Sequence, residues 1–127
     1  MGPVNMHISR KLSESSENTD KYVEGAELSN GQICELFDHT YKVNQKPNET
    51  RENYYCGITN NIAHNKSRHG VSHLICVKCK DADTAAGVET MLRDMGFNIG
   101  EPRYEGNGGA DDSIFVYMCH KTEDFKN

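Results

Sequence analysis

The sequence predicts a small α+β domain in which helices flank a central antiparallel or mixed sheet. Two observations carry this prediction. The ranges 71–80 and 113–119 are rich in β-branched, aromatic and other apolar residues, which favour strands. The range 85–95 instead places apolar residues at the three- and four-residue spacing of a helix. Together with the segments described below, they give the expected order helix, strand, strand, helix, strand, helix, strand.

The length and composition indicate one domain preceded by a tail. A chain of 127 residues is long enough for a single hydrophobic core, although only 35% of its residues are hydrophobic. Residues 1–24 are polar and rich in serine and acidic residues, so we assign them to a flexible acidic N-terminal tail. Residues 25–127 then form the domain.

The first part of the domain predicts a helix followed by a strand. Ser29 is suited to cap a short helix whose apolar side carries Ile33, Leu36 and Phe37. The range 39–43 contains Thr, Tyr and Val, and we interpret it as a first short strand. The polar range 44–53 is expected to be a loop.

The next segment combines a strand with a polar helix. The range 54–58 has the aromatic and β-branched residues of a half-buried strand. Thr59 and Asn60 are candidate helix caps, and about two helical turns over 62–69 would follow. That helix would carry several polar side chains on adjoining faces, namely His64, Asn65, Arg68 and His69.

The remaining segments complete the predicted sheet. The range 71–80 is expected to be a central strand because its middle is continuously apolar. Asp81 or Asp83 would begin the next helix and Gly96 would end it. A glycine-rich loop over 103–112 leads to the last strand, 113–119.

The composition also limits the compartment and the partners. No apolar run has the length of a membrane-spanning helix, and the N-terminus lacks the apolar segment of a signal peptide. We therefore expect a soluble, intracellular and cytoplasmic protein with no membrane partner. The net charge of −5 does not by itself indicate nucleic-acid binding, but most of the excess of acidic over basic residues lies within 1–38, which leaves the remainder near neutral.

The five cysteines are expected to be reduced and metal-free, since an odd number cannot pair completely within one chain. Cys76 and Cys79 have the CxxC spacing of zinc and redox sites. In a strand, however, residues three apart point to opposite faces. A small zinc or redox protein is one alternative function, and this strand placement argues against it.

The segment Tyr55-Cys56-Gly57-Ile58-Thr59-Asn60-Asn61, followed by a basic helix ending in His69, resembles the second half of the GIY-YIG nuclease signature. In the place of the first tripeptide stands His39-Thr40-Tyr41, which retains only the tyrosine. Asn65 stands where this family has its catalytic arginine. The resemblance covers about residues 39–119, and the matching residues are Tyr41, Tyr55, His69, Glu89 and Asn107.

The resemblance implies cleavage of nucleic acid, most simply DNA, with one divalent cation, Mg²⁺ or Mn²⁺. Glu89 would bind the metal, while Tyr41 and Tyr55 would orient or activate water. Arg68 lies about one helical turn from Asn65 and would replace the missing arginine. His69 and Asn107 would support these residues, and all the matched positions would converge on one cleft.

A second function remains open. In this alternative the domain retains the fold without cleavage and binds nucleic acid or a host protein, in the manner of a phage or mobile-element protein that reuses the scaffold. Asn65 and the acidic charge favour this alternative, whereas Glu89 and the two tyrosines favour the enzyme. Each of these residue types has an ordinary structural role by itself, so only their joint pattern points to function.

Overall fold

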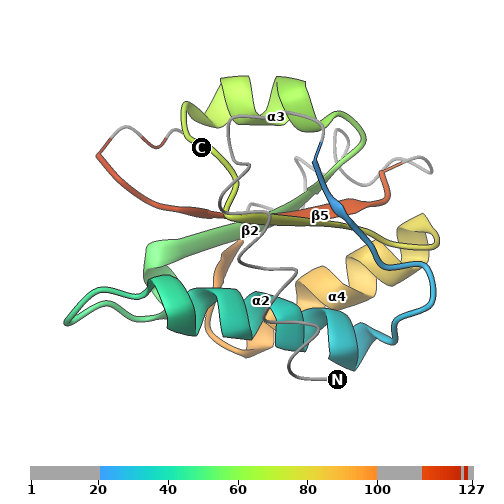
Figure 1. Ribbon diagram of the computed structural model, residues 1–127, viewed down its shortest axis with the longest axis horizontal. Coiled ribbons are helices and arrows are strands. Elements are labelled where there is room, and N and C mark those ends of the chain that lie inside the picture. The colour runs from blue at the N-terminus through green and yellow to red at the C-terminus, as the bar shows by residue number, and fades with distance from the viewer. Residues whose placement is uncertain (1–20, 100–112, 124, 126–127) are drawn as a thin grey trace.

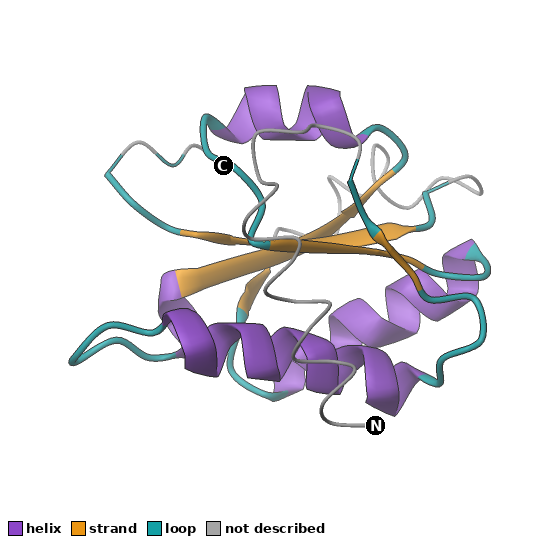
Figure 2. Ribbon diagram, in the orientation of Figure 1, coloured by secondary structure: helices purple, strands orange, loops and turns teal. Residues whose placement is uncertain are grey.

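The computed structural model describes residues 21–99, 113–123 and 125, and in this part of the chain a five-stranded sheet lies between two helical layers (Figure 1). Helix α3 covers one face of the sheet, and helices α2 and α4 cover the other (Figure 2). The elements in chain order are β1 (Val23–Glu24), α2 (Asn30–Asn44), the 3-10 turn η1 (Arg51–Asn53), β2 (Tyr54–Thr59), α3 (Ile62–His69), β3 (Ile75–Lys78), α4 (Ala82–Asp94), β4 (Asn98–Ile99) and β5 (Phe115–His120).

The sheet is mixed, and the predicted α+β class is confirmed. Its strands lie in the order β1-β3-β5-β2-β4. The three inner strands are antiparallel neighbours, with β5 between β3 and β2. The two short outer strands each run parallel to their neighbour, β1 beside β3 and β4 beside β2. The C-terminal strand β5 is therefore central, and it separates strands that are closer to each other in the sequence.

The two faces of the sheet bury different side chains, because successive residues of a strand point to opposite faces. The larger cluster faces α2 and α4 and includes Cys56, Ile58, Val77 and Met118. The smaller cluster faces α3 and consists of Tyr55, Ile62, Cys76, Tyr117 and Cys119, with Val71, Phe115 and Phe125 packed against it. The α3 face is thus rich in aromatic residues.

Helix α2 corrects the sequence prediction for residues 39–43, which are helical rather than a strand. Ser29 caps the helix as expected, and buried residues continue at helical spacing as far as Tyr41. The hydroxyl of Thr40 donates to the carbonyl of Leu36 at 2.9 Å. Burial of this stripe against the sheet outweighs the strand propensity of the local residues.

Strand β1 lies within the segment that the composition assigned to the tail. Val23 is buried, and the N–H of Gly25 donates to the carbonyl of Lys78 at 2.9 Å. A two-residue outer strand buries so few apolar residues that polar composition conceals it. Residues 1–20 lie outside the described part of the chain, so for them the tail remains a prediction.

Strand β2 and helix α3 agree with their predicted ranges. The helix cap differs: it is Asn61, whose side-chain oxygen accepts the N–H of His64 at 2.9 Å, and neither Thr59 nor Asn60. Gly70, with φ of 75°, ends the helix in the left-handed region that favours glycine. The local sequence therefore defines this strand–helix unit well.

The other predicted elements form with shifted ends. Strand β3 is shorter than the range 71–80, but it is paired on both sides, as expected for a central strand. Asp81 caps α4 by accepting the N–H of Thr84 at 2.7 Å, and Gly96 follows the helix with φ of 110°. The glycine-rich range 103–112 lies outside the described residues.

Candidate functional site

Three residues predicted from the sequence lie together on the α3 side of the sheet. Tyr55 projects from β2, His69 is the last residue of α3, and their ring centroids are 5.0 Å apart. Arg68 extends its guanidinium to the same place, with Nη2 3.3 Å from Nε2 of His69. Both rings are buried, whereas Arg68 is exposed.

Tyr117 of β5 completes this site, and the sequence analysis missed it. Its hydroxyl lies 2.8 Å from Nε2 of His69 and 3.2 Å from Nδ2 of Asn65. Tyr117 pairs in register with Gly57, and a Cβ on Gly57 would lie 2.6 Å from the tyrosine hydroxyl. The alternation of residues in 113–119 was visible in the sequence, but the pairing of β5 with β2 was not.

His73 extends the site at its buried end. Its Nε2 lies 3.0 Å from Oδ1 of Asn65, and its ring stacks on Tyr117 with a centroid distance of 4.4 Å. We call the five residues Tyr55, Asn65, His69, His73 and Tyr117 the tyrosine–histidine cluster. No side chain of this cluster belongs to a residue more than 6% exposed.

The hydrogen bonds of the cluster run in one direction. Arg68 can only donate, so Nε2 of His69 accepts, and the Tyr117 hydroxyl donates to that nitrogen as well. The Asn65 amide nitrogen donates to the Tyr117 oxygen, and the Asn65 oxygen accepts from Nε2–H of His73. Nδ1 of His73 is then an unprotonated acceptor, buried without a hydrogen-bond partner among the described residues.

Burial determines the protonation of the cluster. It raises the pKa of Tyr117 far above the ordinary value, and it also raises the pKa of Tyr55. Burial, with smaller electrostatic effects of Lys66 and His69, lowers the pKa of His73 to about 3. At neutral pH both tyrosines therefore keep their protons and His73 is neutral.

Glu89 lies on α4, the helical layer opposite α3, and is only 7% exposed. Its charge nevertheless acts on Tyr55. Burial is the largest cause that raises the pKa of Tyr55, the charge of Arg68 lowers this pKa, and the charge of Glu89 raises it. Glu89 also raises the pKa of buried Cys56. One carboxylate is thus electrostatically coupled to the cluster, and carboxylates are ligands that Mg²⁺ and Mn²⁺ accept. Among the described residues, no three His, Cys, Asp or Glu side chains gather as metal ligands.

Neither Tyr41 nor Glu89 joins Tyr55 on the α3 side, since α4 lies on the other side of the sheet (Figure 1), so the expectation of one common cleft is wrong for both. Because residues 39–43 are helical, Tyr41 packs in the α2–α4 layer against Tyr54, at a centroid distance of 5.2 Å. The guanidinium of Arg51 lies 5.0 Å from the Tyr41 ring centroid. Asn107 lies outside the described residues.

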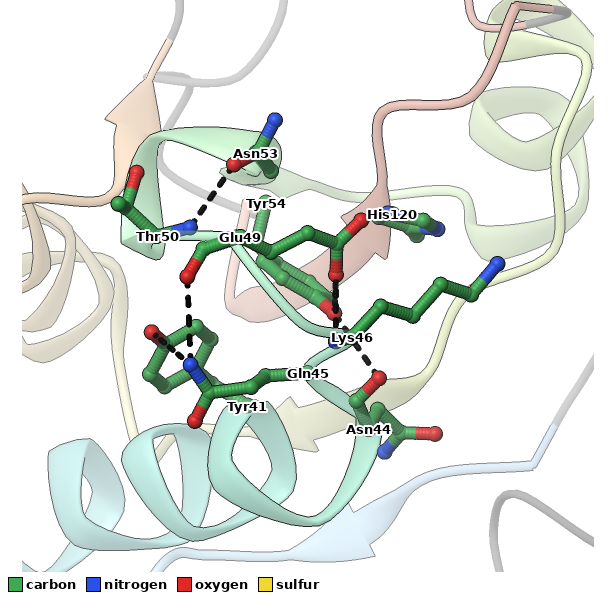
Figure 3. A network of polar contacts seen from close by, with 9 residues as sticks. All are labelled: Tyr41, Asn44, Gln45, Lys46, Glu49, Thr50, Asn53, Tyr54 and His120. Carbon is green, nitrogen blue, oxygen red and sulfur yellow. Dashed lines mark hydrogen bonds and ion pairs between the residues drawn. The ribbon is translucent and has the colours of Figure 1, made fainter.

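A second polar network, centred on Glu49, fastens the loop between α2 and β2 to the end of β5 (Figure 3). Its carboxylate accepts the Tyr54 hydroxyl at 2.7 Å and the Lys46 N–H at 2.9 Å, and it pairs with Nε2 of His120. The bond from Lys46 is the largest cause that lowers the pKa of Glu49, to about 2. These contacts hold the loop against the ends of β2 and β5.

The five cysteines are all buried with free thiols. Cys76 belongs to the α3-side cluster and Cys79 to the opposite one, which confirms that they face away from each other. Burial raises the pKa of Cys79 to about 12 and that of Cys34 to about 11, so these thiols stay protonated. Neither feature supports the zinc or redox alternative.

Comparisons with known proteins add no family assignment: no protein-family model, curated protein or solved structure matches the chain significantly. Within the described part of the chain, no helix has the length and apolar character needed to span a membrane. Function must therefore be argued from the site itself.

Proposed function

We propose that this chain is a catalytically inactive, GIY-YIG-like module that binds nucleic acid through the exposed side of α3. The observation that carries the proposal is the use of Asn65. Its amide is committed to Tyr117 on one side and to His73 on the other, inside the buried cluster. The position from which the resembling family would extend an arginine toward phosphate is therefore occupied by an internal structural contact.

The state of the tyrosines supports the loss of cleavage. A tyrosine that activates water must give up or share its proton, whereas burial raises the pKa of both Tyr55 and Tyr117. Tyr41, the tyrosine implied by the resemblance, packs on the opposite side of the sheet. In the tyrosine–histidine cluster, the polar atoms of Asn65 and Tyr117 bond to one another and to the histidines rather than facing a substrate.

The charge of α3 supports nucleic acid as the ligand. The helix carries Lys66 and Arg68 and contains no acidic residue, in a chain whose net charge is −5. His64 and Arg68 are exposed, so a phosphate backbone could approach this side of the helix without meeting a carboxylate of α3. Among the residues that the structure describes, no comparable local feature favours a host-protein partner.

The test combines binding and cleavage by the same preparation. Wild type, Arg68→Ala and Glu89→Ala are incubated with plasmid and single-stranded DNA in Mg²⁺ or Mn²⁺, and gel retardation and nicking are scored together. We expect retardation without nicking by wild type, and weaker retardation by Arg68→Ala alone. An absence of retardation with every DNA would overturn the proposal and favour a protein partner.

Metal-dependent cleavage of DNA is the second candidate, and one observation favours it. Tyr55 is influenced by both Arg68 and Glu89, the phosphate-binding and metal-binding residues that the resemblance implies. If this candidate is right, wild type nicks DNA, and either alanine variant loses about a hundredfold or more of that activity. Nicking that survives Glu89→Ala would exclude Glu89 as the metal ligand.

A further inference from the structure

The tyrosine–histidine cluster is covered by a residue from the end of the chain. After β5, a turn in which the N–H of Phe125 donates to the carbonyl of Thr122 at 3.0 Å brings Phe125 back over the α3 side of the sheet. Its ring stacks on His69 with a centroid distance of 5.0 Å and an interplanar angle of 10°. The same ring lies 5.1 Å from the ring of Tyr55, tilted by 47°.

The Phe125 ring could be replaced by another planar ring at this contact. The segment is anchored at Lys121, whose N–H donates to the carbonyl of Asn53 at 2.8 Å, and the N–H of Phe125 donates to the carbonyl of Thr122 within the same segment. Phe125 is half-buried, whereas the rings of Tyr55 and His69 beneath it are buried. Stacking on His69 thus helps to hold the Phe125 ring, and another planar ring can make the same contact.

We propose that Phe125 occupies a stacking site for one base of a single-stranded nucleic acid, and that the base displaces it on binding. The inference rests on the proposed function and names its ligand more closely. Aromatic side chains bind single strands by stacking unpaired bases while basic residues contact the backbone. Here the ring of His69 offers the stacking face, the ring of Tyr55 lies beside it at an interplanar angle of 56°, and a guanidinium lies next to His69.

The charge beside the site favours a nucleotide over an aromatic side chain of a peptide. Nη2 of Arg68 is 3.3 Å from Nε2 of the same His69 whose ring Phe125 covers. A nucleotide joins a planar base to a negative phosphate within one residue, so it would meet both groups at once. A duplex cannot do so without unpairing, because its bases are already stacked on each other.

The experiment measures the affinity of the full chain for three labelled probes by fluorescence anisotropy. The probes are a short DNA single strand, its duplex, and an abasic strand of the same length. Because a docked Phe125 reduces the fraction of open sites, Phe125→Ala should bind the single strand about tenfold more tightly than wild type. Its affinity for the abasic strand and for the duplex should not change.

Two further variants keep the result interpretable. Phe115→Ala removes another ring that packs on the same side of the sheet, where it contacts Tyr22 at a centroid distance of 5.2 Å, and it should leave the affinity unchanged. Phe125→Leu retains apolar bulk without a stacking ring, and it should also bind the single strand more tightly. Circular dichroism melting shows whether each variant folds.

The outcomes separate the two proposals. Equal single-strand affinity of wild type and both Phe125 variants would overturn the stacking site and leave the binding function standing. If the Phe125 variants gain as much affinity for the abasic strand as for the intact strand, the stacking site is also overturned. Phe125 would then only shield charge from the strand and would not occupy the position of a base. Binding of no probe by any folded variant would overturn the proposed function and this inference together.

Discussion

Asn65 uses both ends of its side-chain amide for hydrogen bonds inside the protein. It stands on α3 at the position of the family's arginine, but it is 5% exposed and bridges Tyr117 and His73. A buried amide with both ends bonded avoids the cost of unsatisfied polar atoms, about 1–3 kcal/mol for each. An arginine here would have to leave the cluster to reach solvent. The Nε2–H of His73 would then lose its acceptor, and the Tyr117 hydroxyl would keep only its bond to His69.

The buried imidazole of His73 gives a testable dependence of stability on pH. Its pKa is about 3 in the folded state, lowered by burial and by Lys66 and His69, against an ordinary value of 6.5. As pH falls, the unfolded state takes up the proton first. The stabilisation is therefore complete above about pH 6.5, and it decreases as the pH falls from there toward 3.

Urea unfolding between about pH 7 and 5 measures this effect, because this pH range lies above the ordinary pKa values of most carboxyl groups. We expect wild type to lose about 1 kcal/mol of unfolding free energy per pH unit below pH 6.5. His73→Phe keeps a ring for stacking on Tyr117 but cannot be protonated, so its stability should vary less with pH. Parallel curves for the two proteins would show that His73 does not carry the dependence.

At the scale of elements, the site depends on the pairing of β2 with β5. Gly57 faces Tyr117 across that pair, and the absence of a side chain lets the tyrosine ring lie close against β2. The tyrosine hydroxyl then reaches both Asn65 and the last residue of α3, His69. One small residue thus allows a strand from the end of the chain to contribute to the site.

Gly57→Ala tests this arrangement. The added Cβ would lie 2.6 Å from the hydroxyl and 2.9 Å from Cζ of Tyr117, so the ring must shift and lose its bonds. We expect a loss of about 1–3 kcal/mol in unfolding free energy, measured by chemical denaturation. Gly31→Ala is the matched control, because a Cβ there meets only Oγ of Ser29 at 3.9 Å and alanine suits a helix. Equal stability of the two variants would contradict this role of Gly57.

At the scale of the whole molecule, charge is distributed unevenly. The net charge is −5, yet α3 has basic residues in its last turn and no acid along its length. Binding of a polyanion would therefore be confined to one side, with repulsion elsewhere limiting its strength. Such binding must weaken as salt increases, because bound phosphates release counterions to the protein's cations.

The salt dependence of DNA affinity measures how many such contacts form. We expect the logarithm of the affinity to fall linearly with the logarithm of salt concentration, and Arg68→Ala to reduce that slope by about one. Arg93→Ala removes an exposed charge from α4, on the opposite layer, and should leave the slope unchanged. A slope that both variants reduce equally would indicate attraction by overall charge rather than a surface on α3.

The candidate site could be predicted in part. Tyr55, Arg68 and His69 are close in sequence, and the strand–helix unit that carries them follows from local propensity and capping, so their proximity was predictable. The contribution of Tyr117 was not, because it depends on which strands pair. Tyr41 was assigned to the wrong layer because its segment suits a strand locally and a helix only in contact with the sheet.

The sequence by itself determined the features that depend on neighbours within about four residues: the ranges of β2 and α3, and the caps of α2 and α4. Only the tertiary structure decided the strand order, the short outer strands and the layer to which each side chain belongs. Local hydrogen bonds and periodicity act within one segment, whereas strand pairing and burial are gained only between segments distant in the chain. That difference is why β5, nearly sixty residues after β2 in the sequence, lies beside it and completes the tyrosine–histidine cluster.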